Sequence, residues 1–220
     1  MDLLLYLLVL IIPLIAQINV SSTFAKYKQV ANSKGMCGQE VARAILDANG
    51  LNNVHVVEVR GTLSDHYDSN QKVVRLSTDV FHGETIGALA VAAHECGHAI
   101  QDKENYAMLR IRAFLVPVVN LITYSAYIMF FVSLFLQMMD FILVAVAAVF
   151  MSLIFQLVTL PVEFDASKRA MIQLNKLSLV NKKEFDGAEA TLKAAAWTYV
   201  AAVLSSMLNL LRLLRYVDRD

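Results

Sequence analysis

A histidine–glutamate–histidine motif is the feature of this sequence with the clearest chemistry. It reads His94-Glu95-Cys96-Gly97-His98 and matches the pattern HExxH. On a helix, residues four positions apart lie on one face, so the imidazoles of His94 and His98 can bind one Zn²⁺ ion. Glu95 then lies beside the metal without binding it, and can accept a proton from a water molecule that zinc acidifies. The spacing therefore predicts zinc-dependent hydrolysis, with Glu95 as general base and then general acid.

The alternative is a chance match, because HExxH fixes only three of its five positions. Two observations favour a metal site. Residues 84–102 are predicted to form one helix independently of the motif, and we expect its small, apolar first half to be buried. The chain also contains only five histidines, and two of them stand at ligand spacing around a glutamate.

A catalytic zinc site usually has three protein ligands, so one ligand must come from elsewhere in the chain. Glu163 is the candidate, in the segment PVEFDASKRA directly after a long apolar stretch. Asp165 is the alternative, either as the ligand itself or as a helix cap at the membrane interface. Glu163 is favoured because it lies just beyond that stretch, on the side of the membrane where we also expect His94.

Three further side chains could assist catalysis. His66 and Tyr67, within GTLSDHYD, could stabilise the oxyanion of a tetrahedral intermediate. The alternative is that Asp65 and Asp68 shape a turn and that His66 is simply exposed. Arg169 could bind a substrate carboxylate or the intermediate, but an arginine just past a membrane helix is more often a topology determinant.

The composition indicates a membrane protein. Hydrophobic residues make up 57% of the chain, charged residues 17%, and the mean hydropathy is +0.53. A soluble domain carries about a quarter charged residues, so much of this surface must face a lipid bilayer. The net charge is zero, which gives no electrostatic reason to expect nucleic acid as a partner. Two cysteines are too few for a cysteine-rich zinc cage.

Four apolar stretches approach the roughly 20 residues that a spanning helix needs. They are residues 3–20, 114–136, 141–160 and 194–211. The first is interpreted as an uncleaved anchor, since it lacks the basic flank and the cleavage site of a signal peptide. The second and third form a helical hairpin with a turn at 137–140. The fourth is less hydrophobic, and either spans the membrane or packs at its surface.

Basic residues near the helix ends predict the orientation. Lysines and arginines cluster after the first stretch, before the second and after the third: Lys26, Lys28, Lys34, Arg110, Arg112, Lys168 and Arg169. They place residues 21–113 and 162–193 on the cytoplasmic side. Arg212, Arg215 and Arg219 disagree with this topology if the fourth stretch spans.

The polar region after the first stretch adds a small α+β element. Residues 35–50 have helical periodicity and end at Gly50, and two strand-like segments at 54–59 and 72–77 predict an antiparallel pair or small sheet. The expected fold is mainly α, a multi-pass membrane protein with a small α+β gluzincin-like zinc-protease unit. We expect the following segments: an N-terminal anchor (1–20), a catalytic region (21–113), a transmembrane hairpin (114–160), a third-ligand segment with a helix (161–193), and a C-terminal membrane helix with its tail (194–220).

Several longer segments resemble the YugP-type membrane neutral zinc metallopeptidases. The likeness covers almost the whole chain and is carried by CGQEVARAIL, GTLSDHYD, VVRLS, VAAHECGHAIQ, LVPVVN and PVEFDASKRA. More distantly, the chain is similar to the HtpX and CAAX-prenyl-protease group. In that group the zinc helix is followed by membrane helices and then by a Glu-x-x-x-Asp motif that supplies the third ligand.

The resemblance implies roles for individual residues. Carried over position by position, it implies a general base at Glu95 and metal ligands at His94, His98 and Glu163. Ser167 stands four positions after Glu163, where the distant group has aspartate, and a serine cannot offer the carboxylate that orients a ligating histidine. Asp165 is the candidate to compensate. The resemblance also implies a peptidase of the bacterial plasma membrane that acts on peptides or membrane-associated proteins.

A non-catalytic membrane adaptor with a structural zinc ion is the alternative from another functional class. Glu95 argues against it, because a structural site has no use for an unligated acid at that position. A transporter is disfavoured, because the first three apolar stretches carry no charge in their interiors. The candidate protein partners are a membrane adaptor and further copies of this chain in a homo-oligomer.

Overall fold

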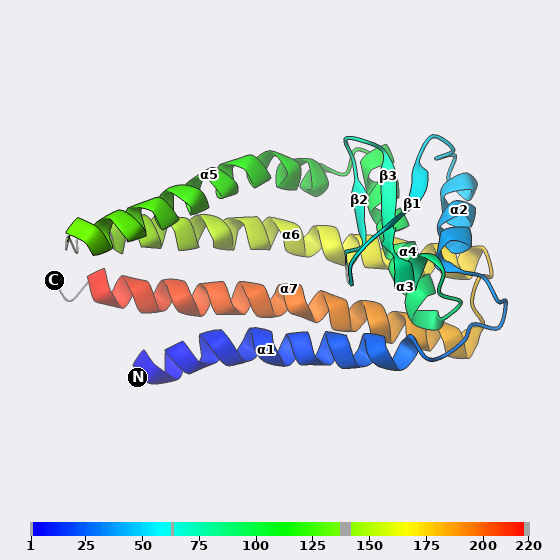
Figure 1. The fold of residues 1–220 in the computed structure, drawn as a ribbon, viewed down its shortest axis with the longest axis horizontal. Coiled ribbons are helices and arrows are strands. Elements are labelled where there is room, and N and C mark those ends of the chain that lie inside the picture. Colours follow the sequence, from blue (N-terminus) through cyan, green and yellow to red (C-terminus); the bar gives the residue numbers. More distant parts are fainter. Residues whose placement is uncertain (1, 63, 137–141, 218–220) are drawn as a thin grey trace. The chain divides into compact units, whose positions relative to one another are not determined.

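The computed structural model describes residues 2–62, 64–136 and 142–217, and it is mainly helical (Figure 1). The elements within these residues are α1 (Asp2–Tyr27), α2 (Gly38–Ala48), β1 (His55–Val59), β2 (His66–Asp68), β3 (Val73–Ser77), α3 (Thr78–Phe81), α4 (Ile86–Lys103), α5 (Ala107–Leu136), α6 (Ile142–Lys176) and α7 (Lys182–Val217). The mainly α fold with a small α+β unit is therefore confirmed. The predicted turn at 137–140 lies outside the described residues.

Four of the described helices are long and apolar enough to cross a membrane. The candidate spans are Leu3–Tyr27, Ala107–Met129, Leu143–Lys176 and Lys182–Arg215. The fourth stretch, left open between spanning and surface packing, thus has the length and composition of a span. The third does not end at residue 160: α6 continues through Pro161 to Lys176, so the segment that carries Glu163 is helical.

The chain divides into two compact units. One comprises Met1–Gln17, Ala107–Pro161 and Thr198–Asp220, and the other comprises Ile18–Tyr106 and Val162–Trp197. Within the first unit, the Ser205 hydroxyl of α7 donates to the Val9 carbonyl of α1 at 2.8 Å. The second unit contains every candidate site residue, so the site can be described within it alone.

The small sheet of the second unit has the order β1-β3-β2. β1 runs parallel to β3, whereas β2 is antiparallel to β3, with Tyr67 opposite Val74. Of the two expected arrangements, an antiparallel pair or a small sheet, the small sheet is confirmed, but the two predicted strands lie parallel in it. β2 and β3 form a hairpin whose connection includes Lys72 at a φ of 52°, and β1 pairs with the other edge of β3.

The core of the second unit forms where α4 packs against α2 and the sheet. The predicted burial of the first half of α4 is confirmed, since its small apolar side chains are almost fully inaccessible: Ala88, Leu89, Ala90, Ala92 and Ala93. α2 contributes Val41, Ile45 and Leu46, and β3 contributes Val74 and Leu76. Burying these side chains stabilises the unit and keeps α4 packed against the sheet. α4 in turn positions the HExxH motif.

Candidate metal centre

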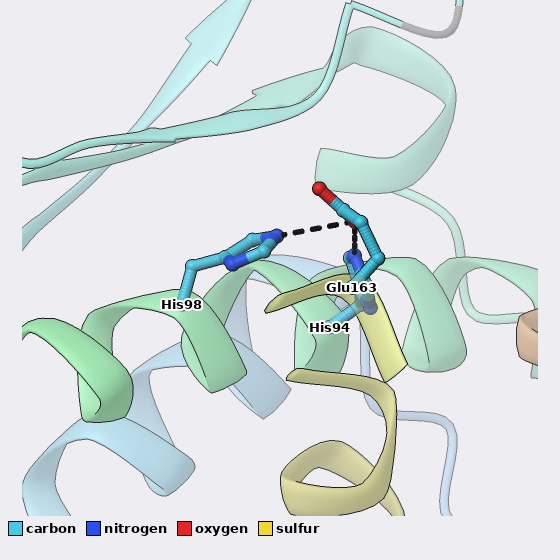
Figure 2. Close-up of side chains that lie close together, drawn as sticks. All are labelled: His94, His98 and Glu163. Carbon is cyan, nitrogen blue, oxygen red and sulfur yellow. Dashed lines mark hydrogen bonds and ion pairs between the residues drawn. The ribbon is translucent and has the colours of Figure 1, made fainter. Parts of the chain in front are cut away.

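α4 and α6 bring three potential metal ligands together. His94 and His98 lie one turn apart on α4, and Glu163 lies on α6 (Figure 2). The Glu163 Oε2 atom is 3.2 Å from His94 Nε2 and 3.6 Å from His98 Nε2. One nitrogen or oxygen atom of each residue lies within 4.8 Å of the others. Two imidazoles and a carboxylate are a donor set that suits zinc, so the residues fit the metal.

A glycine permits this close approach of the two helices. A Cβ atom built on Gly97 would lie 2.4 Å from the backbone carbonyl oxygen of Ala166 on α6. Side chains do not tolerate such a distance, so α6 can contact α4 here only because residue 97 has no Cβ atom. The contact falls between the two histidines in sequence and three residues after Glu163. It therefore sets the distance at which Glu163 meets the imidazoles.

Each histidine is held on its other ring nitrogen by a side chain of the second unit. The Ser167 hydroxyl lies 3.1 Å from His94 Nδ1, and the Gln101 Oε1 atom lies 3.0 Å from His98 Nδ1. With the Nδ1 atoms occupied in this way, both Nε2 atoms face Glu163. A metal-binding histidine usually has its second nitrogen held by such a hydrogen bond, which fixes the ring orientation.

Of the two side chains that hold the imidazoles, Ser167 was considered from sequence but Gln101 was not. Ser167 indeed offers no carboxylate, but its hydroxyl occupies the position from which a partner for His94 is required. Gln101 was missed altogether. The signal that could have found it is its spacing, since it follows His98 by three residues on a helix and so lies next to it. It is also fully buried, where a polar side chain needs partners.

Glu95, the residue after His94, is a buried acid. Its side chain is buried, and this burial raises the pKa of the carboxyl group above its ordinary value. The charges of His94 and His98 act in the opposite direction and lower this pKa, whereas the charge of Glu163 raises it. Burial lowers the pKa of His98, but the hydrogen bond and charge of Glu163 outweigh it and raise the pKa overall. In the absence of metal, a proton on His98 can therefore partner the Glu163 carboxylate.

The remaining predicted residues do not join the three-residue cluster. The Tyr67 hydroxyl donates to Asp102 at 2.6 Å, and burial raises the pKa of Tyr67, which keeps the phenol protonated. The His66 ring is exposed, with its Nδ1 atom 2.8 Å from the Ser64 carbonyl oxygen. Asp165 accepts from Gln101, and Arg169 donates to Asp165.

Comparison with known proteins places the chain in a family. The family model described as "Putative neutral zinc metallopeptidase" matches residues 2–218. A protein of Bacillus subtilis (strain 168) named "Putative membrane protease YugP" is 45% identical over 197 residues, which cover 90% of this chain and 88% of that protein. No solved structure matches the chain. The match to the family model spans nearly the whole sequence, so the chain belongs to the family of neutral zinc metallopeptidases that this model describes.

Proposed function

We propose that this protein is an integral membrane zinc endopeptidase, with His94, His98 and Glu163 as metal ligands and Glu95 as general base. The observation that carries the proposal is the convergence of both Nε2 atoms on the Glu163 carboxylate, beside a buried acid. When bound, zinc supplies a Lewis acid for the scissile carbonyl and lowers the pKa of water to about 7.

The side chains around the cluster have separable roles in this proposal. Glu95 accepts a proton from the attacking water and returns it to the leaving amine, so that peptide hydrolysis consumes one water and leaves the enzyme unchanged. Its raised pKa brings it closer to the working pH, where a base transfers protons best. Ser167 and Gln101 hold the two imidazoles in place. The substrates that we propose are peptides or membrane-associated proteins.

Metal removal tests this proposal directly. The protein purified in mild detergent is expected to contain bound zinc and to cleave casein or an unfolded membrane protein. Dialysis against a chelator should abolish cleavage, and stoichiometric zinc should restore it, because the three side chains form the site without help from another chain. Bound zinc is measured by elemental analysis and cleavage by the appearance of new peptide termini. Zinc without cleavage of any peptide substrate would favour the adaptor alternative, and absence of zinc binding would refute the metal site.

We also propose that the second unit faces the cytoplasm, on the basis of the lysines and arginines that flank the apolar stretches. The chain has a native probe for this, because Cys37 is partly exposed and Cys96 is buried. A membrane-impermeant maleimide is expected to label inside-out vesicles and not intact cells. The Cys37→Ser variant, which retains Cys96, is the control for background labelling. Labelling of Cys37 in intact cells would reverse the proposed orientation.

A further inference from the structure

We infer that Gln101 is a positioning residue for the metal centre, and that it forces His98 to present Nε2 to the metal. This inference rests on the proposed function, since it assumes that His98 is a ligand. It concerns a residue outside the HExxH motif and outside the Glu163 segment. The argument depends on which end of the Gln101 amide faces the histidine.

The neighbours of Gln101 fix the orientation of its amide. The Nε2 atom donates at 2.8 Å to the Val162 carbonyl oxygen and at 2.8 Å to the Asp165 carboxylate. The Val162 carbonyl oxygen can only accept a hydrogen bond, and the Asp165 Oδ2 atom also acts as acceptor for Arg169. Turning the amide over would set its oxygen against two acceptors in a buried site, where unpaired polar groups are costly. The amide nitrogen must therefore face α6, and the oxygen must face His98.

This orientation determines the state of the histidine. The Gln101 Oε1 atom can only accept, so the proton of the 3.0 Å hydrogen bond belongs to His98 Nδ1. As a metal ligand His98 must be neutral, so its one proton stays at Nδ1 and the Nε2 atom is left with its lone pair. That atom is the one that faces Glu163 at 3.6 Å. Gln101 thus selects the tautomer that can bind a metal at Nε2.

At the Asp165 end of the hydrogen-bond network, an arginine holds the carboxylate in place. Arg169 donates to Asp165 through its Nε atom and to Glu104 through its Nη1 atom. The Arg169 Nε atom is 2.5 Å from the Asp165 Oδ2 atom in an ion pair, which holds that oxygen where it accepts from Gln101. The Arg169 side chain therefore acts through Asp165, which differs from the substrate-binding role considered from sequence. The hydrogen bonds link α4 to α6 on the side of His98, as Ser167 links them at His94.

The test compares two buried glutamines of the same unit. Gln101→Leu removes the hydrogen bonds to His98 and to α6. Gln173→Leu removes a glutamine of α6 that is 9% exposed and donates to Asn49 Oδ1 at 3.3 Å. Zinc affinity is measured by competition with a chromophoric chelator. The ligand field is measured from the visible absorption of the Co²⁺-loaded protein, and unfolding by thermal denaturation.

We expect Gln101→Leu to weaken zinc binding about 10- to 100-fold and to change the Co²⁺ spectrum. Gln173→Leu should leave the zinc affinity and the Co²⁺ spectrum unchanged, even if it lowers the unfolding temperature as much as Gln101→Leu does. Wild-type zinc affinity in Gln101→Leu, or equal losses in the two variants, would overturn the inference. Because the readouts are metal affinity and spectrum, the inference can fail while peptide cleavage by the wild type stands. It can also survive if the wild type binds zinc but cleaves no peptide.

Discussion

Glu95→Gln is expected to abolish peptide cleavage while leaving zinc bound. The glutamine keeps the size and shape of the side chain but cannot accept a proton. General acid–base catalysis typically contributes about 10²- to 10⁴-fold to a rate, and we expect a loss at the upper end of this range because the same group acts twice in the cycle. The three proposed ligands do not include Glu95, so the metal content should equal that of the wild type.

The burial of Glu95 makes this variant informative about stability as well. An ionised carboxylate loses hydration when it is buried, and this is the main reason that its pKa is raised. A neutral amide of the same shape avoids that cost, so Glu95→Gln should unfold at an equal or higher temperature than the wild type. Loss of activity without loss of stability would separate a catalytic role from a structural one.

Glu58→Gln is the matched control, because Glu58 lies in the same unit and its carboxylate bonds to Thr78 on the surface. It should leave cleavage and zinc content unchanged. Cleavage is followed as initial rates at saturating substrate, and metal content by elemental analysis of the same preparations. A Glu95→Gln protein that cleaves at a rate within tenfold of the wild type would exclude Glu95 as the base. A variant that also loses its zinc would instead assign Glu95 to the metal shell.

The sequence predicts the candidate metal ligands better than the residues that position them. The spacing of His94 and His98 is a local property of one helix, and the structure places both on the same face of α4. Glu163 is 69 residues from His94, and its approach depends on how α6 packs against α4. Its selection rested on the need for a third ligand and on the resemblance. The one cue for Gln101 is its spacing of three residues from His98, and this cue gains meaning only when the partners of Gln101 on α6 are known.

The differences in the fold have a similar cause. β2 has three residues and is flanked by turn-forming side chains, so its hydrophobic alternation is too short to detect. β2 lies between β1 and β3 in the sequence and pairs with β3 in an antiparallel hairpin, while β1 pairs with β3 in parallel. Local sequence patterns do not reveal this pairing. The third apolar stretch is predicted to end at residue 160, directly before Pro161. α6 nevertheless passes through it, as membrane helices often do.

Gly97→Ala is a substitution outside the ligands from which we expect a large effect on metal binding. Alanine is the better helix former by about 1 kcal/mol, so an isolated helix would gain stability. In the folded protein the added methyl group would meet the Ala166 carbonyl oxygen at 2.4 Å. That oxygen belongs to the backbone and cannot rotate away, so α6 must move relative to α4. Overpacking of this kind typically costs about 1–3 kcal/mol.

The movement would act on the centre through geometry, since Ala166 lies three residues after Glu163 on α6. A displacement that relieves the clash carries the Glu163 carboxylate away from both Nε2 atoms, and we expect zinc affinity to fall at least tenfold. Gly87→Ala is the control on the same helix, because its methyl group would meet its nearest atom at 3.2 Å and needs only a small adjustment. Chelator competition measures both variants, and thermal unfolding shows whether each is folded. Full zinc affinity in a folded Gly97→Ala protein would contradict the view that this helix contact sets the ligand distances, since the methyl group would then have been accommodated without moving Glu163.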